Sequence, residues 1–260
     1  MKIISLAALL LAASPAAAHE FWFEAPDHMV AEGGSIEMGM FVGTDLVGQQ
    51  MPYFPRAFRS LEHFAPDADG AFVAGRLGAM PAVSLDMLSE GLHVLALQSR
   101  DDSLVYSDPE KFRSFLRNEG IEHIIAEHAA RGLPETGFRE SYSRSAKALI
   151  GVGGAEGEDR VIGLPVELVA LDNPFVTDGN IRLRFDVAGS AQASARVNLF
   201  HRSADGTVQE LPLTTGADGV VTVPDLGQGF YLANAVEMVA VEESGPTVWH
   251  SHWASITWTR

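Results

Sequence analysis

The amino-acid sequence predicts a mainly β fold: two immunoglobulin-like or transthyretin-like β-sandwich domains with a short helical connector. Short runs of alternating apolar and polar residues, typical of half-buried strands, occur in both halves of the chain. Clusters of Asp, Asn and Gly separate these runs and supply turn chemistry. Only the middle of the chain changes to a helical period. Sandwich packing is the simplest way to bury one face of so many short strands.

Residues 1–18 have the pattern of a secretory signal peptide. Lys2 gives the positive start, residues 3–13 are apolar, and three alanines at 16–18 form a small-residue cleavage site. Cleavage there makes His19 the first residue, with a free α-amine. The apolar run is too short to span a bilayer, and no later run reaches the roughly 18 residues that a membrane helix needs. We therefore expect a periplasmic protein without membrane insertion.

The composition limits the possible partners. The chain has 34 acidic and 18 basic residues and a formal net charge of −16, which argues against binding to nucleic acid. It has no Cys, so disulfides and thiolate metal sites are excluded. Any transition-metal chemistry must therefore use His and Met.

Residues 19–107 are expected to form the N-terminal sandwich. The clearest strand patterns lie at residues 35–42 and 91–97. Residues 32–34 and 67–70 supply turns.

Residues 108–160 are expected to form the helical connector and a Gly-rich linker. Asp108 followed by Pro109 predicts a helix start, and residues 118–120 predict an interruption before a second helical segment that ends near residue 131. The Gly-rich, charged residues 151–160 predict a mobile linker or an exposed loop.

Residues 161–260 are expected to form the C-terminal sandwich. Seven strand patterns occur at 165–171, 181–187, 196–201, 208–213, 219–223, 230–241 and 248–258.

The His19 position is the first candidate metal site. An N-terminal His offers a metal its amine and its imidazole from one residue, and the amine pKa of about 7.7 to 8.0 permits binding near neutral pH. The alternative is that His19 is only the frayed start of a strand.

His250 and His252 are the second candidate. Side chains alternate along a strand, so these two imidazoles share one face while Trp249, Ser251 and Trp253 share the other. Two imidazoles at this spacing can bind one metal ion. The alternative is a solvent-facing strand edge whose other face packs tryptophans into a core.

The remaining candidates carry weaker patterns. His93 lies in an apolar strand, where a hydrogen-bonded core residue is more common than a ligand. His123 and His128 lack the i, i+4 spacing of a zinc helix and are expected to be structural. Met38 and Met40 share a strand face; thioethers suit Cu(I), but core packing is the more common role. No nucleophile elbow, phosphate loop or metalloprotease motif is present, so we expect no enzyme.

The sequence also resembles a NikM-like periplasmic family, often labelled as the periplasmic component of cobalt or nickel transport and otherwise as a domain of unknown function. The resemblance covers nearly the whole chain after residue 18. It is carried by HEFWFEAP (19–26), ESYSRSAKALI (140–150), GLPVELV (163–169), NPF (173–175), ADG (217–219) and WASITW (253–258). It implies a metal-related binding protein of β-sandwich domains that serves a membrane metal transporter. Near Gly91 the family more usually has an aromatic residue, which makes His93 a local addition.

The leading hypothesis is a non-enzymatic periplasmic protein that binds a divalent transition metal (nickel, cobalt or copper) through His19, aided by His250 or His252. Nitrogen ligands without thiolate suit these ions. The runner-up is a metal-free interaction or carrier module that binds protein or glycan. A third hypothesis is a copper oxidase resembling the lytic monooxygenases, which also start with His.

Overall fold

The structure is a computed structural model that describes residues 19–87, 89–242 and 245–260. The expected signal peptide, residues 1–18, lies outside the described residues. The two helices that are described lack the length and apolar character needed to cross a membrane.

The described residues of the first part of the chain form nine strands and one short 3-10 turn. They are β1 (Glu20–Glu24), β2 (Met29–Val30), β3 (Ser35–Thr44), β4 (Val47–Met51), η1 (Pro55–Ala57), β5 (Phe58–Phe64), β6 (Ala71–Phe72), β7 (Val83–Asp86), β8 (Gly91–Ser99) and β9 (Asp102–Val105). The middle contains α1 (Pro109–Asn118), α2 (His123–Ala130) and β10 (Arg139–Val152).

The C-terminal part contains β11 (Val166–Ala170), β12 (Ile181–Val187), β13 (Ser190–Ala191), β14 (Arg196–Ser203), β15 (Val208–Thr214), β16 (Val220–Val223), β17 (Gly229–Ala240) and β18 (Thr247–Thr259). All seven strands predicted for this part are confirmed, and among its described residues β13 is the one strand that the pattern did not predict.

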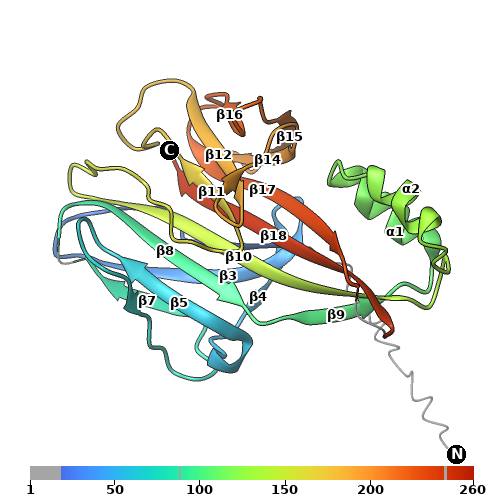
Figure 1. Cartoon of the computed structure of the whole chain (residues 1–260). Helices are drawn as coiled ribbons and strands as arrows, with labels where there is room; N and C mark the ends of the chain where they lie inside the picture. Colours follow the sequence, from blue (N-terminus) through green and yellow to red (C-terminus); the bar gives the residue numbers. More distant parts are fainter. Residues whose placement is uncertain (1–18, 88, 243–244) are drawn as a thin grey trace, which may run out of the picture.

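A ten-stranded central sheet connects the two halves of the molecule. Its strand order is β15-β14-β17-β18-β10-β8-β5-β6, with β2 and β9 also paired to β10. Two four-stranded sheets cover it: β1-β3-β4 with β7, and β11-β12-β13 with β16. In Figure 1 β11, β12 and β16 lie above β10 and β18 of the central sheet, and α1 and α2 lie together to one side.

Each small sheet encloses its own apolar core against the central sheet, so the predicted mainly β, two-sandwich fold is confirmed. Met38, Met40, Leu61 and Leu95 lie in the core under β1-β3-β4, which agrees with the core role expected of the two methionines. The core under β11-β12 includes Trp258.

β10 is the principal difference from the sequence-based organisation. This 14-residue strand falls inside the range expected to be connector and linker, yet it is central and pairs in parallel with β18. The strand lacks the usual alternation of apolar and polar residues because several of its polar residues are buried. Ser143, Ser145 and Lys147 face one side, while Ala146 and Ala148 face the other.

The Gly-rich segment after β10 is held in place rather than exposed throughout. Lys147 Nζ lies 2.7 Å from Asp159 Oδ1 and 3.1 Å from Glu167 Oε1, and all three side chains are buried. Asn173 Nδ2 donates to the carbonyls of Ala155 and Gly157. Composition predicts mobility here, but long-range polar contacts override it.

The predicted helix start at Asp108 is confirmed. Its carboxylate accepts a hydrogen bond of 3.0 Å from the Glu110 backbone N–H, and Pro109 occupies the first turn. The predicted interruption is also confirmed, because α1 ends at Asn118 and Gly120 has a φ of +69°. An added Cβ at Gly120 would lie 2.6 Å from Cβ of Arg196, so glycine lets the end of α1 approach β14 closely.

β1 meets the central sheet through its free edge. Ser255 Oγ donates to the Phe21 carbonyl at 2.6 Å, and Thr257 Oγ1 donates to the Phe23 carbonyl at 3.0 Å. The hydroxyls of β18 thereby satisfy backbone acceptors that an edge strand would otherwise leave unpaired.

Candidate functional site

His250 and His252 lie side by side on β18, as the strand alternation predicts. Their ring centroids are 4.2 Å apart, and both side chains are partly exposed. Trp249, Ser251 and Trp253 are buried on the opposite face. The pair therefore lies on the face of the central sheet that also carries Ile256 and Trp258.

One nitrogen of each imidazole points to the same oxygen atom. His250 Nε2 lies 3.2 Å from Ser143 Oγ, and His252 Nδ1 lies 3.0 Å from it. Ser143 is the register partner of His252 on β10. The hydroxyl has one proton, so it donates to one of these nitrogens and accepts from the N–H of the other. The two ring nitrogens therefore converge on one point.

Ser141 contacts the other nitrogen of His250. Ser141 Oγ lies 2.7 Å from His250 Nδ1, and the same hydroxyl donates to the Trp249 carbonyl at 3.4 Å. The 2.7 Å contact holds the His250 ring in one orientation relative to β10. Nε2 of the same ring faces Ser143.

Burial favours the neutral form of both rings of the pair. Burial, followed by the adjacent His250, lowers the pKa of His252 to about 4, and burial also lowers the pKa of His250. Glu237 is the register partner of His252 on β17, so its carboxylate shares this face of the sheet. A neutral imidazole pair with a nearby carboxylate is suited to a borderline metal ion.

The structure does not bring His19 to the His250 and His252 pair. The His19 ring contacts Thr44, with 3.1 Å between Nδ1 and Oγ1. Burial, and then the charge of Arg144, lowers its pKa. Arg144 pairs with Trp253, and therefore occupies the face of the sheet opposite to His250 and His252. A shared site of His19 with the pair would require a metal to reach through the sheet.

His93 lies in a separate pair with His63. The rings are stacked with centroids 5.1 Å apart, and His63 Nε2 lies 2.9 Å from His93 Nδ1. His93 Nε2 donates to the Ser89 carbonyl at 2.9 Å. Both nitrogens of His93 are therefore occupied, which fits the hydrogen-bonded core role.

His128 is structural, as expected from its helical spacing. Its Nδ1 accepts a hydrogen bond of 2.9 Å from Trp249 Nε1, and its Nε2 lies 3.0 Å from the Pro134 carbonyl. These contacts attach α2 to the central sheet.

A buried polar cluster beside β1 was missed by sequence reasoning. It contains Glu20, Glu119, Asn198 and Asn234, all almost completely buried. Burial, then the charges of Glu20 and Glu210, raises the pKa of Glu119 to about 8. No spacing pattern in the sequence predicts this cluster because its members come from four separate segments. Of the four residues, only Glu20 lies in a stretch that the sequence patterns single out, the opening HEFW.

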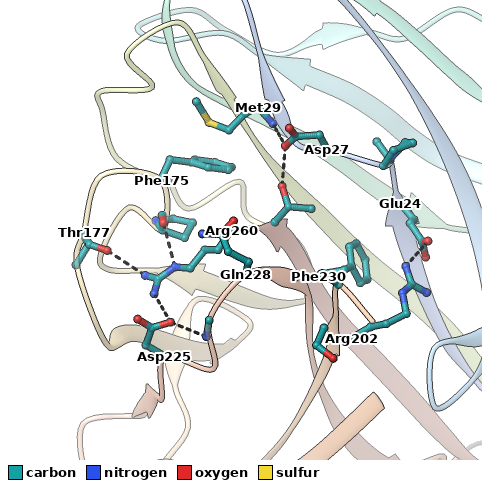
Figure 2. Close-up of a pocket in the computed structure, with 18 of the residues that line it drawn as sticks. Glu24, Asp27, Met29, Phe175, Thr177, Arg202, Asp225, Gln228, Phe230 and Arg260 are labelled. Atoms are coloured by element: carbon teal, nitrogen blue, oxygen red, sulfur yellow. Dashed lines mark hydrogen bonds and ion pairs between the residues drawn. The ribbon is translucent and has the colours of Figure 1, made fainter. Parts of the chain in front are cut away.

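A second feature is a pocket of about 760 Å³ at the other end of the molecule (Figure 2). Arg260 donates to the carbonyls of Pro174, Thr177 and Gly179 and pairs with Asp225. Arg202 pairs with Glu24 and lies over the Phe230 ring. Figure 2 shows that Phe175 and Phe230 approach the pocket from different segments. The pocket therefore combines two aromatic rings with fixed charges.

Among the residues that the structure describes, no three His, Cys, Asp or Glu side chains have the arrangement of a metal site. The histidine pair is therefore a two-nitrogen site, which Ser143 and Glu237 border.

The fold and this site define a double β-sandwich protein with a histidine pair at the surface of its shared sheet. The chain belongs to the family described as "Domain of unknown function (DUF4198)", whose model matches residues 16–238. No curated protein matches the sequence.

Two solved structures are similar over most of this chain. One is a crystal structure of a tetra-tandem repeat in the extending region of a large adhesion protein, at 12% identity and a TM-score of 0.20, covering 92% of this chain and 49% of that chain. The other is a crystal structure of a Salmonella alpha-2-macroglobulin mutant, at 12% identity and a TM-score of 0.23, covering 99% of this chain and 16% of that chain. The chain thus spans about half the length of the first, and TM-scores this low indicate nothing about function.

Proposed function

We propose that this is a periplasmic, non-enzymatic binding protein for a divalent transition-metal ion, with His250 and His252 as the metal ligands. The observation that supports it most is the convergence of His250 Nε2 and His252 Nδ1 on Ser143 Oγ, at 3.2 and 3.0 Å. A metal ion bound by both imidazoles would lie about 2.0–2.1 Å from each nitrogen and would displace the Ser143 hydroxyl from its present contacts.

The proposed ions are nickel, cobalt and copper. Imidazole nitrogens without thiolate suit these metals, and intrinsic affinity among divalent ions is highest for copper. Export through residues 1–18 and delivery to a membrane metal transporter complete the proposal. The strongly acidic surface, with a net charge of −16, favours accumulation of cations near the protein.

The experiment is a calorimetric titration of the metal-free processed protein with nickel, cobalt and copper. His250→Gln and His252→Gln should each weaken binding at least ten-fold. His123→Gln, an exposed histidine on α2, is the matched control and should bind as the wild type does. Equal affinity of the wild type and both variants would disprove the site.

A second titration separates His19 from the pair. A form with one extra residue before His19 has no free His19 amine. Because His19 lies on the opposite face of the sheet, this form should bind metal with unchanged affinity. A large loss of metal affinity would show that the metal binds at the N-terminus instead.

A second candidate function is a carrier for a small glycan, supported by the pocket of about 760 Å³. Aromatic rings with a few fixed polar groups are the usual lining of small-ligand pockets. Glucose, maltose and N-acetylglucosamine are suitable probes, titrated in the presence of a metal chelator. Phe175→Ala should abolish binding, and Phe72→Ala, at an exposed position elsewhere, should not.

A further inference from the structure

Three charged side chains are buried together where β10, the segment after it and β11 meet. They are Lys147, Asp159 and Glu167, with exposed side-chain fractions of 1%, 0% and 2%. The surroundings of Lys147 are apolar, because its register partner Ile256 on β18 and Leu149 on the same face of β10 belong to the core under β11-β12. Solvent water therefore has little access to its ammonium group.

The side-chain nitrogen of Lys147 faces the carboxyl carbon of Asp159. Nζ lies 2.7 Å from Oδ1 and 2.8 Å from Oδ2. A nitrogen this close to both oxygens lies within roughly 3–3.5 Å of the carbon between them, which is the separation of a near-attack arrangement. The amine and the carboxyl group are thus placed as the two reactants of an amide-forming condensation.

Backbone N–H groups hold both carboxyl oxygens of Asp159. The Arg160 N–H donates to Oδ1 at 2.7 Å, and the Ala170 N–H donates to Oδ2 at 2.8 Å. Such donors stabilise the negative charge that develops on a carboxyl oxygen when a nucleophile adds to its carbon. Burial raises the pKa of Asp159, against the lowering effect of Lys147. Burial thus favours the neutral acid, which can lose a hydroxyl group.

Glu167 places a base beside the same nitrogen. Its Oε1 lies 3.1 Å from Lys147 Nζ, and a general base must lie within hydrogen-bond reach of the proton that it takes. Three backbone N–H groups fix this carboxylate in position: Ile162 donates to Oε1 at 2.8 Å, and Gly163 and Leu164 donate to Oε2 at 3.0 and 3.3 Å.

We propose that Lys147 and Asp159 form an intramolecular isopeptide bond, with Glu167 as the catalytic base. The ammonium of Lys147 first gives one proton to the Asp159 carboxylate, which leaves a neutral amine and a neutral acid. The amine lone pair then attacks Cγ of Asp159. Glu167 takes one proton from the nitrogen and gives it to the departing hydroxyl group. One N–C bond forms, one C–O bond breaks and one water molecule leaves, with no change in oxidation state.

The water has a route to solvent, because Asp159 and Arg160 also line a pocket of about 1060 Å³. The bond would join the Gly-rich segment to the central sheet and close a loop over residues 147–159. A covalent loop lowers the entropy of the unfolded chain, and this chain has no Cys with which to form a disulfide. The reaction uses none of the metal ligands proposed above and is therefore independent of metal binding.

The experiment is a mass measurement of the full processed chain. The wild type should be lighter than its sequence, counted from the measured N-terminus, by the mass of one water molecule. Trypsin cleaves after a free Lys or Arg, so an unlinked chain gives the peptides 145–147 and 148–160. The linked chain should instead give 145–160 as one peptide, also lighter by one water. Fragmentation of this peptide should place the link between Lys147 and Asp159.

Three variants separate the bond from other losses of water, and circular dichroism confirms that each is folded. Lys147→Arg should have the full mass of its sequence. Glu167→Gln should accumulate at least ten-fold less linked chain, whereas Glu158→Gln, at an exposed position close by, should be linked as the wild type is. The peptide map of the wild type decides the question if a variant does not fold.

Two results would overturn the proposal and leave a structural ion pair only. One is a wild-type chain of full mass that trypsin cleaves completely after Lys147. The other is the same loss of water in Lys147→Arg as in the wild type, which would assign the loss to a reaction without the lysine. Equal linkage of the wild type and Glu167→Gln would overturn the role of Glu167 as the base.

Discussion

Ser255 Oγ donates a hydrogen bond of 2.6 Å to the backbone carbonyl of Phe21, more than two hundred residues earlier in the chain. Thr257 repeats the contact with Phe23 at 3.0 Å. Alternate side chains of β18 thus donate hydrogen bonds to the backbone carbonyls on the open edge of β1. This contact positions His19 and Glu20 relative to the central sheet.

Removal of these hydroxyls should destabilise the protein. Ser255→Ala or Thr257→Val leaves a buried carbonyl without its donor, at a cost of roughly 1–3 kcal/mol each. Urea unfolding followed by tryptophan fluorescence measures the loss. Ser190→Ala, at an exposed position, should change the free energy of unfolding by less than about 0.5 kcal/mol. Wild-type stability of Thr257→Val would show that water replaces the hydroxyl.

Lys147 should be among the least replaceable charged residues. Its ammonium is buried with Asp159 and Glu167, so Lys147→Met leaves two buried carboxylates without a cation. We expect a loss of about 3–5 kcal/mol in the free energy of unfolding. Arg182→Met removes the exposed pair with Asp172 and should cost less than about 1 kcal/mol. Similar losses in both variants would contradict this account.

Glu140 should make stability depend on pH. Its side chain is buried and accepts from Tyr106 and Ser251. Burial raises its pKa to about 7 against these two donors. The unfolded chain releases this proton near the ordinary value of about 4.5 and the folded protein near 7. Stability from this group is therefore greatest below about 4.5 and decreases as the pH rises to about 7.

Glu140→Gln should remove the part of the pH dependence of stability that comes from this group. Between pH 5 and pH 8 the wild type should lose roughly 1–3 kcal/mol more than the variant, because each unit of pKa shift corresponds to about 1.4 kcal/mol. Urea midpoints at a series of pH values provide the measurement. Glu32→Gln, at an exposed position, should keep the wild-type slope. An identical slope for Glu140→Gln would assign the pH dependence to other groups.

Ser141 should affect metal affinity without binding the metal. Its hydroxyl contacts His250 Nδ1 at 2.7 Å and holds the orientation of the ring, and loss of such a partner typically costs 10- to 100-fold in affinity. We expect Ser141→Ala to weaken nickel or copper binding about ten-fold with little change in unfolding. Binding equal to that of Ser190→Ala would mean that Ser141 does not orient the ring.

Much of the fold follows from local patterns in the sequence. The seven C-terminal strands, the Asp108 cap, the break at residues 118–120 and the shared face of His250 and His252 all depend on neighbours within a few residues. Alternation and capping act over that range, so a single sequence contains the information. β10 escaped recognition because its buried Lys147 and serines are satisfied by partners from other segments.

The sequence by itself determined the β-sandwich class, the strand periods and the pairing of His250 with His252 on one face. Only the tertiary structure decided that His19 lies on the opposite face of the sheet, and that Glu119 accepts from two asparagines. The reason is physical: side-chain direction within a strand is local, whereas strand register and sheet packing arise from contacts between segments far apart in the chain. Such contacts leave no fixed spacing in the sequence.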